Sequence, residues 1–283
     1  MKRVGKEKGM KAVFFAAACT SVIAVAFICI FLFANGVPAI KEIGLGKFVL
    51  GEVWRPSNQL FGIFPMIVGS LYVTLGAVLI GVPIGVFTAV FLAEYCPKKL
   101  YRFLKPAVDL LAGIPSVIYG FFGLVVLVPV VRDTLGGDGN SIVTASILLG
   151  IMILPSVITV SESAIRAVPD HYYEGALALG ATKERSIMTT VLPAAKSGIF
   201  AGIILGIGRA IGETMAVIMV AGNQARVPDS VLKGVRTLTA NIVIEMGYAT
   251  DLHREALIAT GVVLFVFILI INLAFSFVKR KVY

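Results

Sequence analysis

This sequence contains few charged residues and very few of the residue types that build disulfide frameworks or metal sites. Charged residues make up only 14% of its 283 residues, and it has two His, three Cys and one Trp. So little charge excludes an ordinary soluble domain. The cysteines, Cys19, Cys29 and Cys96, give no disulfide pattern, and we interpret them as small apolar residues.

A nucleotide-binding loop is also missing. No segment matches the pattern G-x-x-x-x-G-K-[ST], in which a glycine-rich loop and a lysine hold the phosphates of ATP. The pairs Gly5-Lys6 and Gly46-Lys47 lack both the upstream Gly and the following Ser or Thr. We therefore expect no catalytic residues and no bound cofactor in this chain, and any ATP that drives it must bind to a separate subunit.

Long apolar runs are what the sequence has in abundance. Hydrophobic residues make up 58% of the chain, and its mean hydropathy is +0.95. A helix of roughly 20 apolar residues crosses the hydrocarbon core of a bilayer. The sequence predicts an all-α integral membrane protein with six transmembrane helices, at 12–34, 66–93, 110–131, 142–160, 198–221 and 256–278.

The distribution of Lys and Arg predicts how these helices are oriented. The first span follows a basic segment, but its apolar run is longer than that of a signal peptide and no clear cleavage site follows, so we expect it to be retained. If both termini are cytoplasmic, sixteen of the 25 Lys and Arg residues lie inside, eight lie outside and only Arg209 lies within a span. The net charge of +9 then reflects orientation and does not indicate nucleic-acid binding. His171 and His253 fall on opposite sides of the membrane, so no metal site is expected.

We expect the chain to have two parts. Residues 1–65 contain the first helix and the first outer loop, and residues 66–283 form a core of five helices with a cytoplasmic loop at 162–196. The second outer loop, 222–255, has apolar residues at helical spacing, which predicts an amphipathic helix across the outer mouth. We favour a surface helix that covers the bundle, built on Val231, Val235, Leu238, Ile242 and Met246.

The cytoplasmic loop 162–196 is polar but rich in helix-forming residues. Pro169 and Asp170 can begin a short helix, and Gly180 can end it in a left-handed conformation. Thr182 can cap a second helix, which Pro193 would end. Two helices joined by a glycine turn would protrude from the membrane, so we predict a handle for a cytoplasmic partner.

Three parts of this loop resemble the EAA loop of bacterial ABC importer permeases: Glu174-Gly175-Ala176, Gly180-Ala181 and Leu192-Pro193. The resemblance implies a type I importer permease fold in which a short coupling helix docks into a groove of a cytoplasmic ATPase. Gly175 stands where the family has Ala, and Thr190 occupies a position that is usually aliphatic. The coupling residues implied by the resemblance are Glu174, Gly175, Ala176, Leu177, Gly180 and Ala181.

The fifth span carries two charges in its middle, Arg209 and Glu213, within the run GIILGIGRAIGETMAVIMVAGN. Charges inside a membrane are costly and rare unless they have a function. Glycines at a spacing of four let neighbouring helices approach closely, which would direct the charges into the assembly. The glycines expected to serve helix packing are Gly202, Gly206, Gly208 and Gly212.

Two interpretations of the charges remain open. Arg209 and Glu213 are four residues apart, so on a continuous helix they could pair with each other and serve packing alone. Alternatively, they line a substrate pathway, because the forked donors of a guanidinium suit a tetrahedral oxyanion. We favour the pathway, since two apolar residues would pack at the same place without any desolvation cost.

The residues around Arg209 extend the resemblance to the permeases of phosphate ABC importers. The similar segments are Gly208–Val217, Gly222-Asn223, Ala112–Gly120, Tyr173–Thr182 and Thr237–Ile242, and the likeness covers residues 10–283. It implies a permease subunit of an ATP-driven importer of inorganic phosphate in a bacterial or archaeal inner membrane. The implied partners are a second permease, two copies of a cytoplasmic ATPase that uses ATP and Mg, an extracytoplasmic phosphate-binding protein and membrane lipid, but no nucleic acid.

Two other functions stay open. The chain could import a different oxyanion, or it could be an ATP-independent anion channel or carrier. Several residues interrupt the predicted spans, namely Gly113, Pro115, Pro83 and Pro155. A kink near Pro115 could open a carbonyl toward the pathway or could serve packing only. Glu162 and Asp109 lie near predicted cytoplasmic ends, where they can reach water, so we assign them no role.

Overall fold

The computed structural model describes the backbone of residues 2–281 and the side chains of residues 10–274. Met1, Val282 and Tyr283 lie outside these limits, as do most of the basic side chains near both termini that were used to predict the orientation, namely Lys2, Arg3, Lys6, Lys8, Lys279, Arg280 and Lys281. The elements are α1 (Lys2–Ile43), α2 (Leu45–Leu50), β1 (Trp54–Arg55), β2 (Leu60–Phe61), α3 (Phe64–Val90), α4 (Lys98–Gly113), α5 (Ser116–Phe122), α6 (Val128–Leu135), α7 (Ile142–Arg166), α8 (Asp170–Ala178), α9 (Lys183–Ser186), α10 (Leu192–Gly212), α11 (Met215–Val220), α12 (Leu238–Met246) and α13 (Asp251–Lys281).

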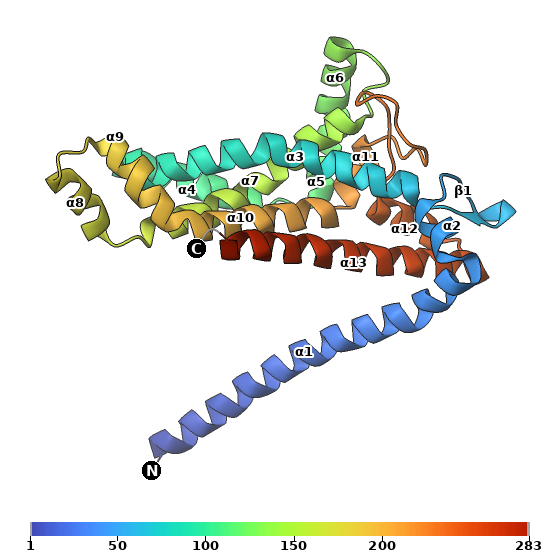
Figure 1. Ribbon diagram of the computed structural model, residues 1–283, viewed down its shortest axis with the longest axis horizontal. Helices are drawn as coiled ribbons and strands as arrows, with labels where there is room; N and C mark the ends of the chain where they lie inside the picture. Colours follow the sequence, from blue (N-terminus) through green and yellow to red (C-terminus); the bar gives the residue numbers. More distant parts are fainter. Residues whose placement is uncertain (1, 282–283) are drawn as a thin grey trace.

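Six helical stretches of the described chain are long and apolar enough to cross a membrane, so the predicted helical membrane protein is confirmed. They are Met10–Ile43, Phe64–Tyr95, Ser116–Leu135, Ile142–Arg166, Lys183–Gly212 and Asp251–Ala274. Figure 1 shows α8 and α9 at one end of the bundle, and α12 with the β1–β2 hairpin at the other. We call these the α8 end and the α12 end.

Helix α7 forms the centre of the bundle, between α3 and α10 (Figure 1). Four of its large apolar side chains are at most 1% exposed: Leu148, Leu149, Met152 and Ile153. Glycines on both neighbours permit the close approach, because Gly81 of α3 lies against Gly150 and Gly206 of α10 lies against Val157. Lipid offers no hydrophobic drive for helix association, so this packing contact is a main source of stability.

Helix α10 contains two pairs of glycines, Gly202 with Gly206 and Gly208 with Gly212, and the two pairs have different surroundings. A Cβ added to Gly206 would lie 2.9 Å from Cγ2 of Val157, whereas a Cβ on Gly208 would meet no atom within 4 Å among the described residues. Gly202 likewise packs on α7, and Gly212 has the same open surroundings as Gly208. Among the described residues, no neighbouring helix therefore packs on the expected second stripe.

We predict that Gly206→Ala lowers the free energy of unfolding by about 1–3 kcal/mol, because the added methyl group overpacks the contact with α7. Gly208→Ala should leave the stability unchanged or raise it slightly, because Ala is the better helix former. Thermal unfolding of the two variants in detergent measures the difference. Equal shifts in the midpoint would contradict the packing that we describe.

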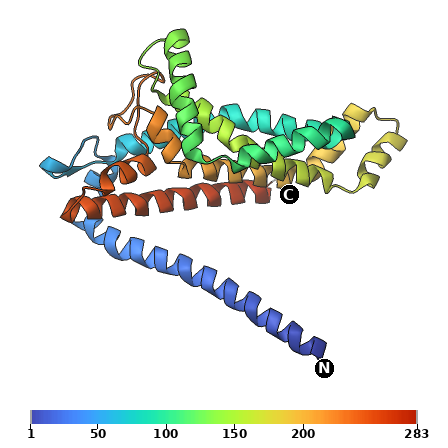
Figure 2. The ribbon, with the colours of Figure 1, turned by 180° about the vertical axis from the view of Figure 1, so that it is seen from behind.

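Helix α1 leaves the bundle at an angle. It packs against α13 near the α12 end, where the rings of Phe33 and Phe265 are 5.9 Å apart and Gly36 lies against Val262. From there α1 diverges toward its N-terminus, as both views show (Figures 1 and 2). The most hydrophobic window of α1 is 0% buried within the described residues, as expected for a surface that faces lipid or another subunit.

A second apolar core lies at the α12 end. Trp54 and Phe61 of the hairpin pack with Leu238 of α12 and Leu257 of α13. The expected helix over Val231–Met246 is shorter than predicted, because it begins only at Leu238. Thr237 caps this helix, and its hydroxyl accepts a hydrogen bond from the amide of Ala240. Leu238, which belongs to the predicted apolar face, is fully buried, and so is Asn241, whereas Val243 is exposed.

Two predicted spans are interrupted. The span expected at 110–131 breaks between α4 and α5, because Pro115 disfavours a helical conformation of Ile114, whose ψ is 125°. The span expected at 198–221 breaks after Gly212, where Glu213 is extended with ψ of 133°. The continuous fifth helix of the sequence prediction is therefore wrong, and its apolar run forms α10 and α11.

Three of the prolines considered in the sequence analysis do not end the helices that contain them. Pro193 was expected to end the second helix of the cytoplasmic loop, but the helical stretch continues from Lys183 to Gly212. A wide, π-type turn over Ile187–Val191 precedes Pro193 and accommodates its missing N–H. Pro83 and Pro155 likewise lie inside α3 and α7.

Candidate functional site

The break between α10 and α11 is the centre of the candidate site. Arg209 lies in the last turn of α10, and Glu213 is the first residue beyond that helix. The Glu213 carboxylate accepts a hydrogen bond of 3.2 Å from the amide of Ala216 and so caps the first turn of α11. Each charge thus lies at the helix terminus whose partial charge it offsets, the cation at a C-terminus and the anion at an N-terminus.

Arg209 and Glu213 form no ion pair with each other in the described structure. The intrahelical pair considered above requires a continuous helix, and the break at Glu213 removes it. Arg209 Nη1 instead donates to the hydroxyl of Ser156 at 3.4 Å, and Ser156 lies near the middle of α7. Arg209 is half-buried. A packing pair therefore does not explain these charges.

The broken helices meet beside Arg209. Gly120 of α5 packs against Ala216 and Met219 of α11. The Tyr119 hydroxyl donates to the carbonyl oxygen of Leu111 at 2.8 Å, which satisfies a backbone acceptor that the α4–α5 break leaves free. A kink near Pro115 was considered above as a way to open a carbonyl toward the pathway. The carbonyl of Leu111 is such a group, but the Tyr119 hydroxyl already bonds to it. Tyr119 is also close enough to Arg209 to interact electrostatically.

Helix α12 closes the break from the α12 end. Thr239 donates its hydroxyl to the carbonyl oxygen of Glu213 at 3.0 Å. Near this break, Gly113, Gly208 and Gly212 each have open space where a Cβ would stand. The guanidinium of Arg209 thus contacts the middle of α7, and the described chain leaves open space at the neighbouring Gly208 and Gly212.

The predicted coupling residues lie on α8 and in the turn that follows it. Figure 1 shows α8 projecting from the bundle. Gly180 has φ of +85°, its amide bonds to the carbonyl of Leu177, and the amide of Ala181 bonds to the carbonyl of Ala176. These two bonds form the Schellman motif that ends a helix at a glycine. Thr182 caps α9, as predicted, by accepting from the amide of Arg185.

The surface of α8 is open for a partner. Glu174 is exposed, and a Cβ on Gly175 would meet no described atom within 4 Å. Leu177 is 39% exposed and Leu179 is 91% exposed. Apolar side chains on a projecting helix are costly in water, so this surface is suited to docking against another protein.

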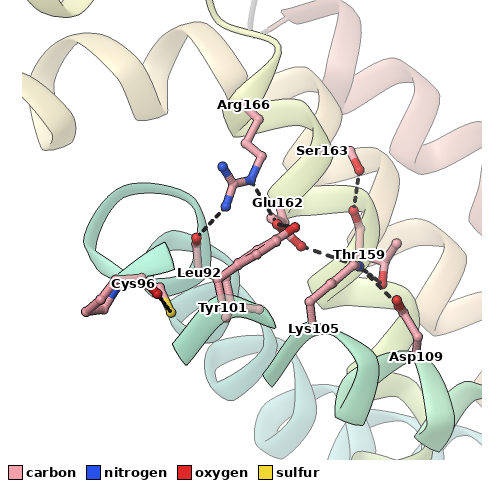
Figure 3. A network of polar contacts seen from close by, with 10 residues as sticks. Leu92, Cys96, Tyr101, Lys105, Asp109, Thr159, Glu162, Ser163 and Arg166 are labelled. Carbon is pink, nitrogen blue, oxygen red and sulfur yellow. Dashed lines mark hydrogen bonds and ion pairs between the residues drawn. The ribbon is translucent and has the colours of Figure 1, made fainter. Parts of the chain in front are cut away.

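The sequence prediction missed a buried ionic cluster near the α8 end (Figure 3). Glu162 of α7 is only 2% exposed, and its Oε1 accepts from the Tyr101 hydroxyl at 2.7 Å and from Nε of Arg166 at 2.9 Å. Its Oε2 lies 3.4 Å from Nζ of Lys105. The sequence contained a signal for part of this cluster, because Glu162 and Arg166 are four residues apart at the end of an apolar span.

Two further contacts extend this cluster. Arg166 Nη2 donates to the carbonyl of Leu92 at 2.7 Å, and its guanidinium carbon lies 4.6 Å from the centre of the Tyr101 ring. The pKa of Tyr101 lies above its ordinary value of 10.0, mainly because its hydroxyl donates to the Glu162 carboxylate and also because of burial. Tyr101 therefore stays a hydroxyl donor throughout the physiological pH range.

A second missed cluster lies at the α12 end. Glu245 is 6% exposed, and it accepts from Arg236 at 2.6 Å and from the Trp54 indole at 2.8 Å. His253 lies 2.9 Å from the same carboxylate. Glu245 thus joins the hairpin, the loop before α12, α12 itself and the start of α13.

Comparison with known proteins relates this chain to transport permeases. The family described as "Binding-protein-dependent transport system inner membrane component" matches residues 81–282. The chain is 38% identical over 266 residues to the Bacillus subtilis protein named "Probable ABC transporter permease protein YqgH", with 90% of this chain and 85% of the relative covered. It is 36% identical over 272 residues to the "Phosphate transport system permease protein PstC" of Mesorhizobium japonicum, with 89% and 83% covered.

A solved structure shares the fold. A chain of a bacterial alginate ABC transporter, in complex with an alginate pentasaccharide-bound periplasmic protein, superposes with a TM-score of 0.64 at 19% identity. The superposition covers 95% of both chains. At this identity the likeness concerns the arrangement of the helices.

Proposed function

This chain belongs to the family of binding-protein-dependent transport system inner membrane components, and we propose that it is the permease subunit through which an ATP-driven importer passes inorganic phosphate. Its fold is that of type I ABC importer permeases. The phosphate cargo is supported by the name of the relative from Mesorhizobium japonicum, whose sequence matches most of this chain.

Arg209 is the observation that carries the proposal. Its guanidinium lies beside a helix break, makes one long hydrogen bond to Ser156 near the middle of α7 and forms no ion pair among the described residues. A guanidinium offers several donors in a fixed plane, which suits the oxygens of a tetrahedral anion. We infer that phosphate passes Arg209, and that Glu213 fixes the backbone around it.

The subunit would work with partners that supply energy and cargo. We propose a second permease of the PstA type, two copies of a cytoplasmic ATPase of the PstB type and an extracytoplasmic phosphate-binding protein of the PstS type. ATP and Mg would bind to the ATPase, because this chain contains no phosphate-binding loop. The exposed surface of α8 would dock into the ATPase, and closure of the two ATPases would pull on α8.

We further propose that the chain lies in a bacterial or archaeal inner membrane with both termini in the cytoplasm. The positive-inside bias of its Lys and Arg residues supports this orientation. It places the α8 end in the cytoplasm and the α12 end outside, where the binding protein would deliver phosphate.

Substrate and energy source can be tested together in proteoliposomes that contain the whole complex and its binding protein. We expect uptake of radiolabelled phosphate that requires ATP on the α8 side and that unlabelled phosphate suppresses better than sulfate, molybdate or a phosphonate. Uptake that continues without ATP and follows the membrane potential would indicate a channel or carrier. Stronger competition by another oxyanion would reassign the cargo.

A charge reversal on α8 should uncouple the subunits without disturbing the fold. Glu174 is exposed on α8, so we expect Glu174→Lys to reach the membrane, to lose the ATPase in co-purification and to lose uptake. Glu42→Lys is the matched control for ATPase co-purification, because Glu42 is exposed at the α12 end, far from the docking surface on α8. Normal ATPase recovery with Glu174→Lys would argue against this docking surface.

A further inference from the structure

Helix α4 is held in an unusual way. None of its 16 residues is buried, and its principal neighbour in the described chain is α7. Apolar packing within this chain therefore fixes α4 only weakly. The specific contacts come from Tyr101 and Lys105, which lie one helical turn apart and both reach the buried carboxylate of Glu162 (Figure 3).

The cluster around Glu162 does not have the charge of an anion-binding site. Lys105 lies 3.1 Å from Asp109 and donates to Thr159 at 3.1 Å, in addition to its ion pair with Glu162. Two cations, Lys105 and Arg166, face two carboxylates, so the cluster is neutral and its donors are engaged. It joins three segments of the chain: α4, the last turns of α7, and the backbone at Leu92.

The two ends of this cluster lead to the two functional regions. Arg166 is the last residue of α7, and α8 begins four residues later at Asp170. In the other direction, α4 continues from Lys105 to Leu111, whose carbonyl accepts from the Tyr119 hydroxyl, and Arg209 is within electrostatic range of Tyr119. The backbone from α8 to Arg166, the contacts of Glu162 with α4 and the hydrogen bond from Tyr119 to Leu111 therefore connect the docking surface on α8 with the α4–α5 break.

We propose that Glu162 is a positioning residue that transmits the movement of α8 to the α4–α5 break beside Arg209. This inference rests on the proposed function, because an ATPase must move α8. When α8 is pulled, the last turn of α7 moves with it, and the bonds from Glu162 to Tyr101 and Lys105 carry α4 along. Without the carboxylate, α7 can move while α4 stays behind, so ATP is hydrolysed without opening the pathway.

The first test measures phosphate transported per ATP hydrolysed, in proteoliposomes with the complete complex and binding protein. Glu162→Gln should lower this ratio at least about tenfold, the factor that corresponds to one charge-assisted hydrogen bond, while ATP hydrolysis continues. Asp109→Asn is the matched control, because Asp109 belongs to the same cluster but its side chain is 54% exposed. It should retain the wild-type ratio. A Glu162→Gln complex whose uptake and hydrolysis fall in proportion would overturn the proposal.

Tyr101→Phe keeps the proposal testable if Glu162→Gln does not assemble. This variant removes one hydroxyl donor and leaves every charge in place, so the complex should fold and show a smaller fall in the same ratio. An unchanged ratio in Tyr101→Phe, together with failed assembly of Glu162→Gln, would assign Glu162 to stability alone.

A second readout does not depend on the cargo. In a complex whose native cysteines are replaced by Ser, Ala112→Cys places a thiol at the exposed end of α4. A non-hydrolysable ATP analogue should change the rate at which a maleimide modifies this thiol, and Glu162→Gln should abolish that change. The same change in both proteins would overturn the proposal. A wild-type response without phosphate uptake would refute the proposed cargo and leave the role of Glu162 standing.

Discussion

Replacing Arg209 with Gln is expected to lower the initial rate of phosphate uptake by about a hundredfold, which corresponds to about 3 kcal/mol for a charge-assisted contact with the passing anion. The structure indicates that the loss would come from transport. Arg209 makes a single hydrogen bond of 3.4 Å to Ser156, so its removal breaks little of the fold. We therefore expect uptake by the reconstituted complex to fall, while recovery of the complex from the membrane stays at the wild-type level.

A series of substitutions defines what Arg209 contributes. Arg209→Lys keeps the charge but loses the planar set of donors, so we expect an intermediate rate. Arg132→Gln is the control, because Arg132 is exposed and pairs only with the neighbouring Asp133. Full uptake by Arg209→Lys would exclude bidentate recognition of the anion. Full uptake by Arg209→Gln would remove Arg209 from the pathway.

Replacing Glu245 with Ala is expected to cost about 3–5 kcal/mol of stability, the range for removing one partner of a buried ion pair. The substitution leaves Arg236, the Trp54 indole and His253 without their shared acceptor. Because Glu245 and these three partners belong to four different segments at the α12 end, we expect the hairpin and α12 to loosen together. Thermal unfolding in detergent, monitored through the fluorescence of Trp54, measures the effect at the site.

Two variants distinguish the loss of a buried acceptor from the loss of any carboxylate. Glu255→Ala removes an exposed carboxylate from α13 and should leave the unfolding midpoint unchanged. The pair Glu245→Leu with Arg236→Met replaces both charges by apolar groups and should recover part of the stability. A midpoint in Glu245→Ala that equals that of the wild type would contradict this arrangement.

Local signals were enough to predict most of the helices and the loop that carries α8. Apolar length alone identified six membrane helices, because each must satisfy its own backbone within the bilayer. Gly180 and Thr182 were predicted correctly as a left-handed turn and a helix cap, since both effects depend on a single residue and its neighbours.

The errors arose where tertiary contacts decide the outcome. Hydropathy does not distinguish one helix from two that share an apolar run, so the break at Glu213 was missed, and with it the separation of the two charges. Pro193 was expected to end a helix, but a π-type turn absorbs it. The spacing of four between Glu162 and Arg166 was a local signal, but the contact of Glu162 with Tyr101 joins residues about 60 positions apart, and no local pattern pairs those two.

The most direct test is radiolabelled phosphate uptake in cells that lack every other phosphate system, with wild type, Arg209→Gln and Glu174→Lys compared at equal membrane levels. If Arg209 lines the pathway and α8 docks the ATPase, both variants lose uptake, while only Glu174→Lys loses the ATPase in co-purification. If both variants take up phosphate at the wild-type rate, Arg209 is not part of a phosphate pathway and α8 does not couple this chain to ATP.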